Sequence, residues 1–71
     1  MTLTSKFKAK DIGILRAAAN KEIFLDLKDP KLYKKVKRYY QNEIDFTGED
    51  PEADYSLVVE YLRQDLLEVE V

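Results

Sequence analysis

Residues 50–69 read DPEADYSLVVEYLRQDLLEV, and this stretch decides the fold because it is the most clearly amphipathic helix in the chain. The pair Asp50-Pro51 predicts its start, since the aspartate can accept hydrogen bonds from unpaired N–H groups and proline suits the first helical position. At 100° per residue, its apolar residues fall within an arc of about 100°. They are Tyr55, Val58, Val59, Leu62, Leu66 and Val69. The pattern predicts a helix over roughly 51–68 with one buried face.

Two further helices are predicted upstream of this stretch. The pair Asp29-Pro30 repeats the start signal and predicts a helix over roughly 30–43. Its apolar positions at helical spacing are Leu32, Val36 and Tyr39 or Tyr40. A third helix is predicted over roughly 8–20, where one stripe holds Ile12, Leu15, Ala19 and Ile23. We therefore expect an all-α fold, a small three-helix bundle forming a single domain over residues 1–71.

The segment 22–27 leaves a second architecture open. It could prolong the first helix, but Asp26 would then fall on the apolar stripe, and the same residues suit a short strand. A strand needs a partner, and alternating apolar and polar residues near 2–6 and 67–71 offer two. The alternative is a small α+β fold with short strands near 2–6, 22–27 and 67–71.

The residue types present exclude most catalytic and metal-binding systems. The sequence has no histidine and no cysteine, which removes the common nucleophile–base pairs and the usual zinc ligands. Two glycines cannot supply a glycine-rich phosphate-binding loop. So small a core rarely forms the desolvating pocket that carboxylate or lysine chemistry needs. We expect no enzyme activity, no cofactor and no small-molecule substrate.

One acidic cluster invites a calcium or magnesium interpretation. It surrounds Gly48 and consists of Asp45, Glu49, Asp50, Glu52 and Asp54. Counted from Asp45, however, the glycine and the final glutamate of an EF-hand loop are both misplaced. The favoured interpretation is a helix N-terminus, with Asp50 as the cap and acidic residues near the positive end of the helix dipole.

Charge is distributed unevenly, although the net charge is only −2. Residues 1–42 hold eleven basic against four acidic residues, whereas residues 43–71 hold ten acidic residues against Arg63. No apolar run is long enough to cross a membrane, and lysines follow the first residues where a signal peptide would have its apolar core. We expect a cytoplasmic protein that does not enter membranes.

The basic half contains a candidate nucleic-acid interface on the helix 30–43. Residues 31–40 interleave basic residues with tyrosines, so cations could neutralise phosphates while aromatic rings stack on bases. The candidate residues are Lys31, Lys34, Lys35, Lys37, Arg38, Tyr33 and Tyr40. The competing interpretation is a solvated helix face whose lysines pair with the acidic C-terminal helix.

The acidic helix contains a candidate protein-binding surface. Leu57, Tyr61 and Leu67 lie off its main apolar stripe, and Leu57 and Tyr61 are stacked at i, i+4. An exposed aromatic and leucine with a polar rim would form a hot spot for a partner, although scattered surface apolar residues are also common. Our leading hypothesis is a non-enzymatic interaction or regulatory module that binds a protein partner or itself, possibly as a homodimer. Nucleic-acid binding is the alternative.

Overall fold

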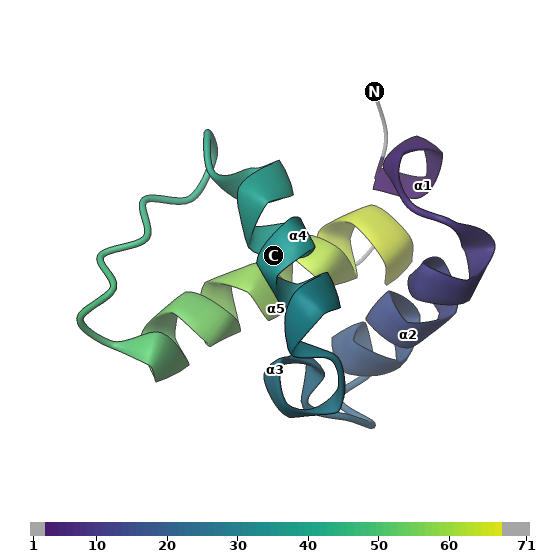
Figure 1. Cartoon of the computed structure of the whole chain (residues 1–71), viewed down its shortest axis with the longest axis horizontal. Helices are drawn as coiled ribbons and strands as arrows, with labels where there is room; N and C mark the ends of the chain where they lie inside the picture. The colour runs from purple at the N-terminus through teal and green to yellow at the C-terminus, as the bar shows by residue number, and fades with distance from the viewer. Residues whose placement is uncertain (1–2, 68–71) are drawn as a thin grey trace.

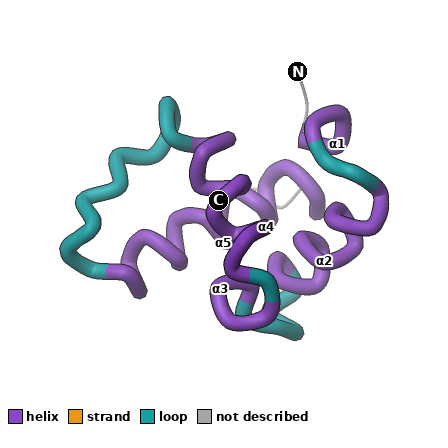
Figure 2. Tube along the Cα trace, in the orientation of Figure 1, coloured by secondary structure: helices purple, strands orange, loops and turns teal. Residues whose placement is uncertain are grey.

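The computed structural model describes residues 3–67, and every regular element in this range is a helix (Figure 2). The five helices are α1 (Leu3–Lys6), α2 (Ala9–Ala19), α3 (Leu25–Lys28), α4 (Pro30–Tyr40) and α5 (Pro51–Leu67). The predicted all-α class is confirmed. The described residues contain five helices instead of three, because α1 and α3 add one helical turn each.

The α+β alternative is wrong at the two predicted strand segments that fall within the described residues, near 2–6 and 22–27. Residues 3–6 form α1, and the segment 22–27 contains a turn followed by the start of α3. There the N–H of Lys28 donates to the carbonyl of Phe24 at 2.8 Å, so the local backbone bonds within its own turn and not to a strand. Of the third predicted strand, near 67–71, Leu67 ends α5 and the rest lies outside the described residues.

Both predicted helix starts are confirmed by their capping hydrogen bonds. The side chain of Asp29 accepts from the N–H of Leu32 at 3.1 Å. The side chain of Asp50 accepts from the N–H groups of Glu52 and Ala53 at 3.1 and 3.2 Å. These bonds satisfy donors that have no partner inside the helix, which fixes where α4 and α5 begin.

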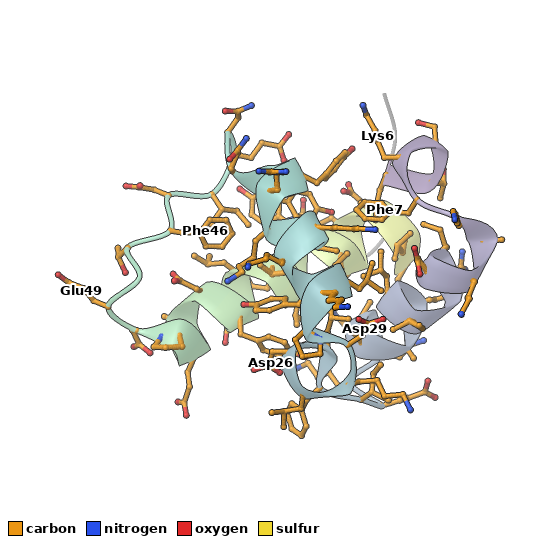
Figure 3. The ribbon with its side chains drawn as sticks, in the orientation of Figure 1. Lys6, Phe7, Asp26, Asp29, Phe46 and Glu49 are labelled. Atoms are coloured by element: carbon orange, nitrogen blue, oxygen red, sulfur yellow. The ribbon has the colours of Figure 1, made fainter. Side chains whose placement is uncertain are left out.

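The core forms where α1, α2 and α4 meet α5, and α3 packs against α2 and α4 (Figure 1). Its fully buried side chains include Leu15, Leu25, Val36, Val58 and Leu62. The loop between α4 and α5 also contributes, because Ile44 is buried and Phe46 packs against the core (Figure 3). The apolar face predicted for α5 is confirmed at Val58, Leu62 and Leu66.

Candidate functional site

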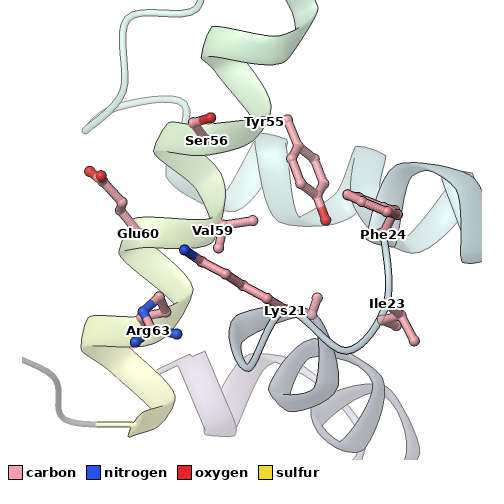
Figure 4. A pocket seen from close by; sticks show the side chains of 9 residues that line it. Lys21, Ile23, Phe24, Tyr55, Ser56, Val59, Glu60 and Arg63 are labelled. Atoms are coloured by element: carbon pink, nitrogen blue, oxygen red, sulfur yellow. The ribbon is translucent and has the colours of Figure 1, made fainter.

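An apolar groove lies between the C-terminal end of α2 and the middle of α5 (Figure 4). Its volume is about 580 Å³, and it is partly open to solvent. The lining residues are Ala18, Lys21, Ile23, Phe24, Tyr55, Ser56, Val59, Glu60 and Arg63. Ligand sites typically have volumes of about 300–1,000 Å³ and combine apolar walls with a few polar groups, so the groove is large enough to receive a side chain from a partner.

A tight reversal of the chain after α2 forms one wall of the groove. The N–H of Lys21 donates to the carbonyl of Ala18, and that of Glu22 to the carbonyl of Ala17, both at 3.0 Å. Lys21 has a φ of 63°, in the left-handed region that normally ends a helix in this way. This reversal carries the chain away from α2 and places Phe24 opposite α5.

Arg63 joins the two walls. Its Nη1 donates to the carbonyl oxygen of Ala19 at 2.6 Å, across 44 residues of sequence. That carbonyl belongs to the last turn of α2, where the backbone carries partial negative charge, so a guanidinium is favourable there. Arg63 therefore links α5 to the last turn of α2 beside the groove.

Tyr55 anchors α3 at the opposite end of the groove. Its hydroxyl accepts a hydrogen bond from the N–H of Leu25 at 2.9 Å, and its ring centroid lies 6.4 Å from that of Phe24 and 5.6 Å from that of Tyr33. Burial raises the pKa of Tyr55, although the bond from Leu25 acts in the other direction. The phenol is therefore neutral at pH 7 and acts as a fixed polar contact in an aromatic wall.

Two large apolar side chains at the start of α3 are the most exposed among the described residues, and one of them, Phe24, lines the groove. Phe24 is 67% exposed and Leu27 is 78% exposed, whereas Leu25 between them is fully buried. Sequence reasoning missed both residues because the segment 22–27 was ambiguous between helix and strand. The usable signal was the i, i+3 spacing of Phe24 and Leu27, which places them together only if the segment is helical.

The three residues predicted to bind a protein partner are placed outside the groove lining. Leu57 is 38% exposed, Tyr61 is half-buried, and Leu67 packs partly against the core. The ring of Tyr61 lies 5.2 Å from that of Tyr40, and its hydroxyl donates to the carbonyl of Glu43 at 3.4 Å. The neighbours of Tyr61 thus come from α4 and the following turn, which leaves Leu57 as the most exposed of the three.

The predicted nucleic-acid surface is only partly assembled. Four cations of α4 are exposed on its outer face, namely Lys31, Lys34, Lys35 and Arg38. The Nζ of Lys37 lies 4.7 Å from the ring centroid of the half-buried Tyr33, an arrangement that favours a cation–π contact. Tyr40 is only 1% exposed, and its hydroxyl donates to Asp65 at 2.5 Å. This burial contradicts the predicted stacking role of Tyr40, because no ring face is left for a base.

The acidic cluster supports the start of α5. Besides the cap at Asp50, the N–H of Gly48 donates to the buried Asp54 at 3.4 Å, which holds the loop against the helix. Gly48 has a φ of 74°, a conformation that glycine adopts without strain. Within residues 3–67, no group of three acidic, histidine or cysteine side chains is placed to hold a metal ion.

The comparisons with known proteins leave function to be inferred from the molecule itself. No family model, curated protein or solved structure matches the chain. None of the helices in the described range is long and apolar enough to span a membrane.

Proposed function

We propose that the chain is a non-enzymatic interaction module that binds a protein through the groove between α2 and α5. The observation that carries the proposal is the exposure of Phe24, which lines a groove of about 580 Å³, together with the exposure of Leu27 three residues further along the same turn. Burying a large apolar side chain contributes about 1.5–3 kcal/mol, and such residues beside a pocket are typical binding hot spots. The proposed place of action is the cytoplasm, which suits a chain that contains no cysteine.

The groove is held in a defined shape before any partner arrives. The carbonyl of Phe24 accepts from the N–H groups of Leu27 and Lys28 at 3.1 and 2.8 Å, which fixes the backbone that carries both exposed side chains. Tyr55 holds the next residue of the same turn through its hydroxyl. Binding therefore requires little ordering of the backbone, and less conformational entropy is lost than in a flexible loop.

Site-specific photo-crosslinking tests this proposal. A benzophenone amino acid is placed at Leu27, or at Leu57 on the candidate surface of the acidic helix, and the full chain is irradiated in cells of its source. We expect adducts of discrete mass from position 27. Unlabelled wild-type chain should compete with their formation, whereas the Phe24→Ser/Leu27→Ser variant should not.

Position 57 is the control for the crosslinking experiment. Adducts from position 57 alone would move the interface to the surface that contains Leu57 and Tyr61. The absence of competed adducts from both positions would reject a protein-binding role for either surface. Circular dichroism of the Phe24→Ser/Leu27→Ser variant checks that it retains its helices, which is expected because both side chains are largely exposed.

We propose nucleic-acid binding by α4 as the second candidate function. The observation that favours it is the shared exposure of Lys31, Lys34, Lys35 and Arg38. These four side chains follow one helix face at i, i+3, i+4 and i+7, a spacing that can contact successive phosphates. The acidic residues of α5 oppose long-range attraction of a polyanion, so this candidate ranks second.

Salt-dependent binding tests the second candidate. Affinity for duplex DNA and single-stranded RNA is measured by fluorescence anisotropy between about 50 and 200 mM salt. The Lys34→Gln/Lys35→Gln/Arg38→Gln variant should bind more weakly and with a shallower salt dependence, by roughly 0.9 in log–log slope for each phosphate of duplex DNA that it no longer neutralises. Lys21→Gln, which removes a cation from the groove, is the matched control. An unchanged slope in the triple variant would exclude the α4 face.

A further inference from the structure

The exposed apolar side chains and the groove lie next to each other on one face of the molecule, and this arrangement specifies a particular occupant. An interface between identical chains across a two-fold axis must be complementary to itself. Phe24 is exposed at the edge of the groove that it lines, and the buried Val59 belongs to the same groove, so one face offers both an apolar anchor and a recess. We propose that the partner is a second copy of this chain, with Phe24 of each copy entering the groove of the other.

This inference rests on the proposed protein-binding function and names its partner. A two-fold rotation places Phe24 of each copy over the recess of the other, so two anchors are buried by a single arrangement. Phe24 already belongs to the wall that contains Tyr55, and an incoming Phe24 would meet Tyr55 and Val59 as apolar and aromatic neighbours.

Charge at the groove supports a self-complementary contact. The groove lining carries two positive charges, Lys21 and Arg63, and one negative charge, Glu60; the guanidinium of Arg63 is directed at the carbonyl of Ala19 within its own chain, which leaves Lys21 and Glu60 to meet a partner. In Figure 4, Lys21 extends across the groove toward Val59, whereas Glu60 points outward. An isologous contact that brings Lys21 of each copy near Glu60 of the other forms two opposite-charge pairs.

The size of this surface sets the expected affinity. The whole described chain has an accessible surface of 5261 Å², so one face supplies an interface at the small end of the range for specific complexes. We expect a reversible dimer that forms within the concentration range of a sedimentation experiment, about 10 µM to 1 mM.

Sedimentation velocity on the full chain over a concentration range of about 10 µM to 1 mM tests the dimer. Wild type should shift from monomer to dimer across this range. Phe24→Ser and Leu27→Ser should each weaken the dimer by about tenfold or more, since each removes an apolar anchor. Leu57→Ser is the matched control and should leave the dimer unchanged, because its side chain is exposed but lies away from the groove lining.

Exchange of the two charges tests the two-fold arrangement directly. Lys21→Glu and Glu60→Lys should each weaken the dimer by about threefold to tenfold, because each introduces like-charge pairs. The Lys21→Glu/Glu60→Lys variant should recover most of the original affinity. Glutamate and lysine meet the same backbone constraint at position 21, and circular dichroism checks that all variants remain folded.

Each contrary outcome overturns a stated part of the inference. A wild-type chain that stays monomeric to 1 mM would exclude the second copy, while crosslinked adducts to a protein of another mass would still support the groove as a binding site. A dimer broken by Leu57→Ser and not by Phe24→Ser would place the interface on the surface that contains Leu57 and Tyr61. Failure of the charge exchange to restore affinity would overturn the pairing of Lys21 with Glu60.

Discussion

Lys21 occupies a left-handed conformation that favours glycine. Its φ of 63° costs an ordinary residue about 1–2 kcal/mol, whereas glycine adopts it without steric penalty. We predict that Lys21→Gly raises the free energy of unfolding by about 1 kcal/mol, after allowance for the greater flexibility of glycine in the unfolded chain. Urea denaturation at low protein concentration measures the change. Glu22→Gly is the control and should not stabilise, and equal stabilisation by both variants would contradict the prediction.

Tyr40 contributes a buried polar contact between α4 and α5. Its hydroxyl donates to the carboxylate of Asp65 at 2.5 Å while the ring is 1% exposed. We predict that Tyr40→Phe lowers the free energy of unfolding by about 1 kcal/mol, because the exposed Asp65 can replace the missing hydroxyl with water. Chemical denaturation provides the measurement. Tyr61→Phe, which removes only a 3.4 Å bond to a carbonyl, should cost less. A larger destabilisation in Tyr61→Phe would argue against this assignment.

At the scale of the element, α2 contains a residue that weakens it. Gly13 lies in the interior of this helix, is exposed, and has open space where a Cβ would stand. We predict that Gly13→Ala stabilises the chain by about 0.5–1 kcal/mol through the higher helix propensity of alanine. The thermal midpoint should rise by roughly 2–8 °C.

The second glycine provides the matched control for this prediction. Gly48 also has open space around it, but its φ of 74° strains any residue with a Cβ. Gly48→Ala should therefore lower the thermal midpoint while Gly13→Ala raises it. Movement of both midpoints in the same direction would show that local backbone conformation does not govern these two sites.

Over the whole molecule, tyrosine rings join α4 to α5. Tyr33 contacts Tyr55 with ring centroids 5.6 Å apart, and Tyr40 contacts Tyr61 at 5.2 Å. These contacts come from hydroxyl-bearing rings, so the packing of the two helices depends on the phenols staying neutral. The free energy of unfolding should therefore fall at alkaline pH, where the phenols lose their protons.

Alkaline conditions should destabilise the fold through these phenols. Burial, with a smaller contribution from Asp26 and Asp54, raises the pKa of Tyr33 to about 12. Burial, followed by the hydrogen bond to Asp65, also raises the pKa of Tyr40. In the unfolded chain both phenols titrate near about pH 10. Above that pH the unfolded state binds fewer protons on them than the folded state, so the free energy of unfolding falls as pH rises.

Urea midpoints between about pH 8 and 11 check this linkage. The stabilisation from both phenols is complete below about pH 10 and is lost as pH rises through their folded pKa values. We predict a falling midpoint above about pH 10, with a smaller fall in Tyr40→Phe because one titrating group is absent. A midpoint that stays constant to pH 11 would contradict the prediction.

The sequence alone determined the class of the fold and the starts of its two best helices. Asp29 and Asp50 cap α4 and α5 where the Asp-Pro pairs predicted, because capping depends on bonds to N–H groups within the next three residues. The buried face of α5 was equally predictable, since helical periodicity fixes which side chains share a face. These features are local, so a stretch of sequence contains the information that they require.

The candidate site and the burial of the Tyr40 ring depend on contacts between residues that are distant in the sequence. Beside the groove, Arg63 reaches Ala19 across 44 residues, and no local pattern indicates such a bond. Tyr40 belongs to a stripe that could face solvent or α5, and contact with Asp65 and Tyr61 selected burial. The segment 22–27 was ambiguous for the same reason: its helical turn is held by Tyr55, which lies 30 residues away from Leu25. Long-range contacts select among locally similar conformations, and the surface left open for a partner follows from that selection.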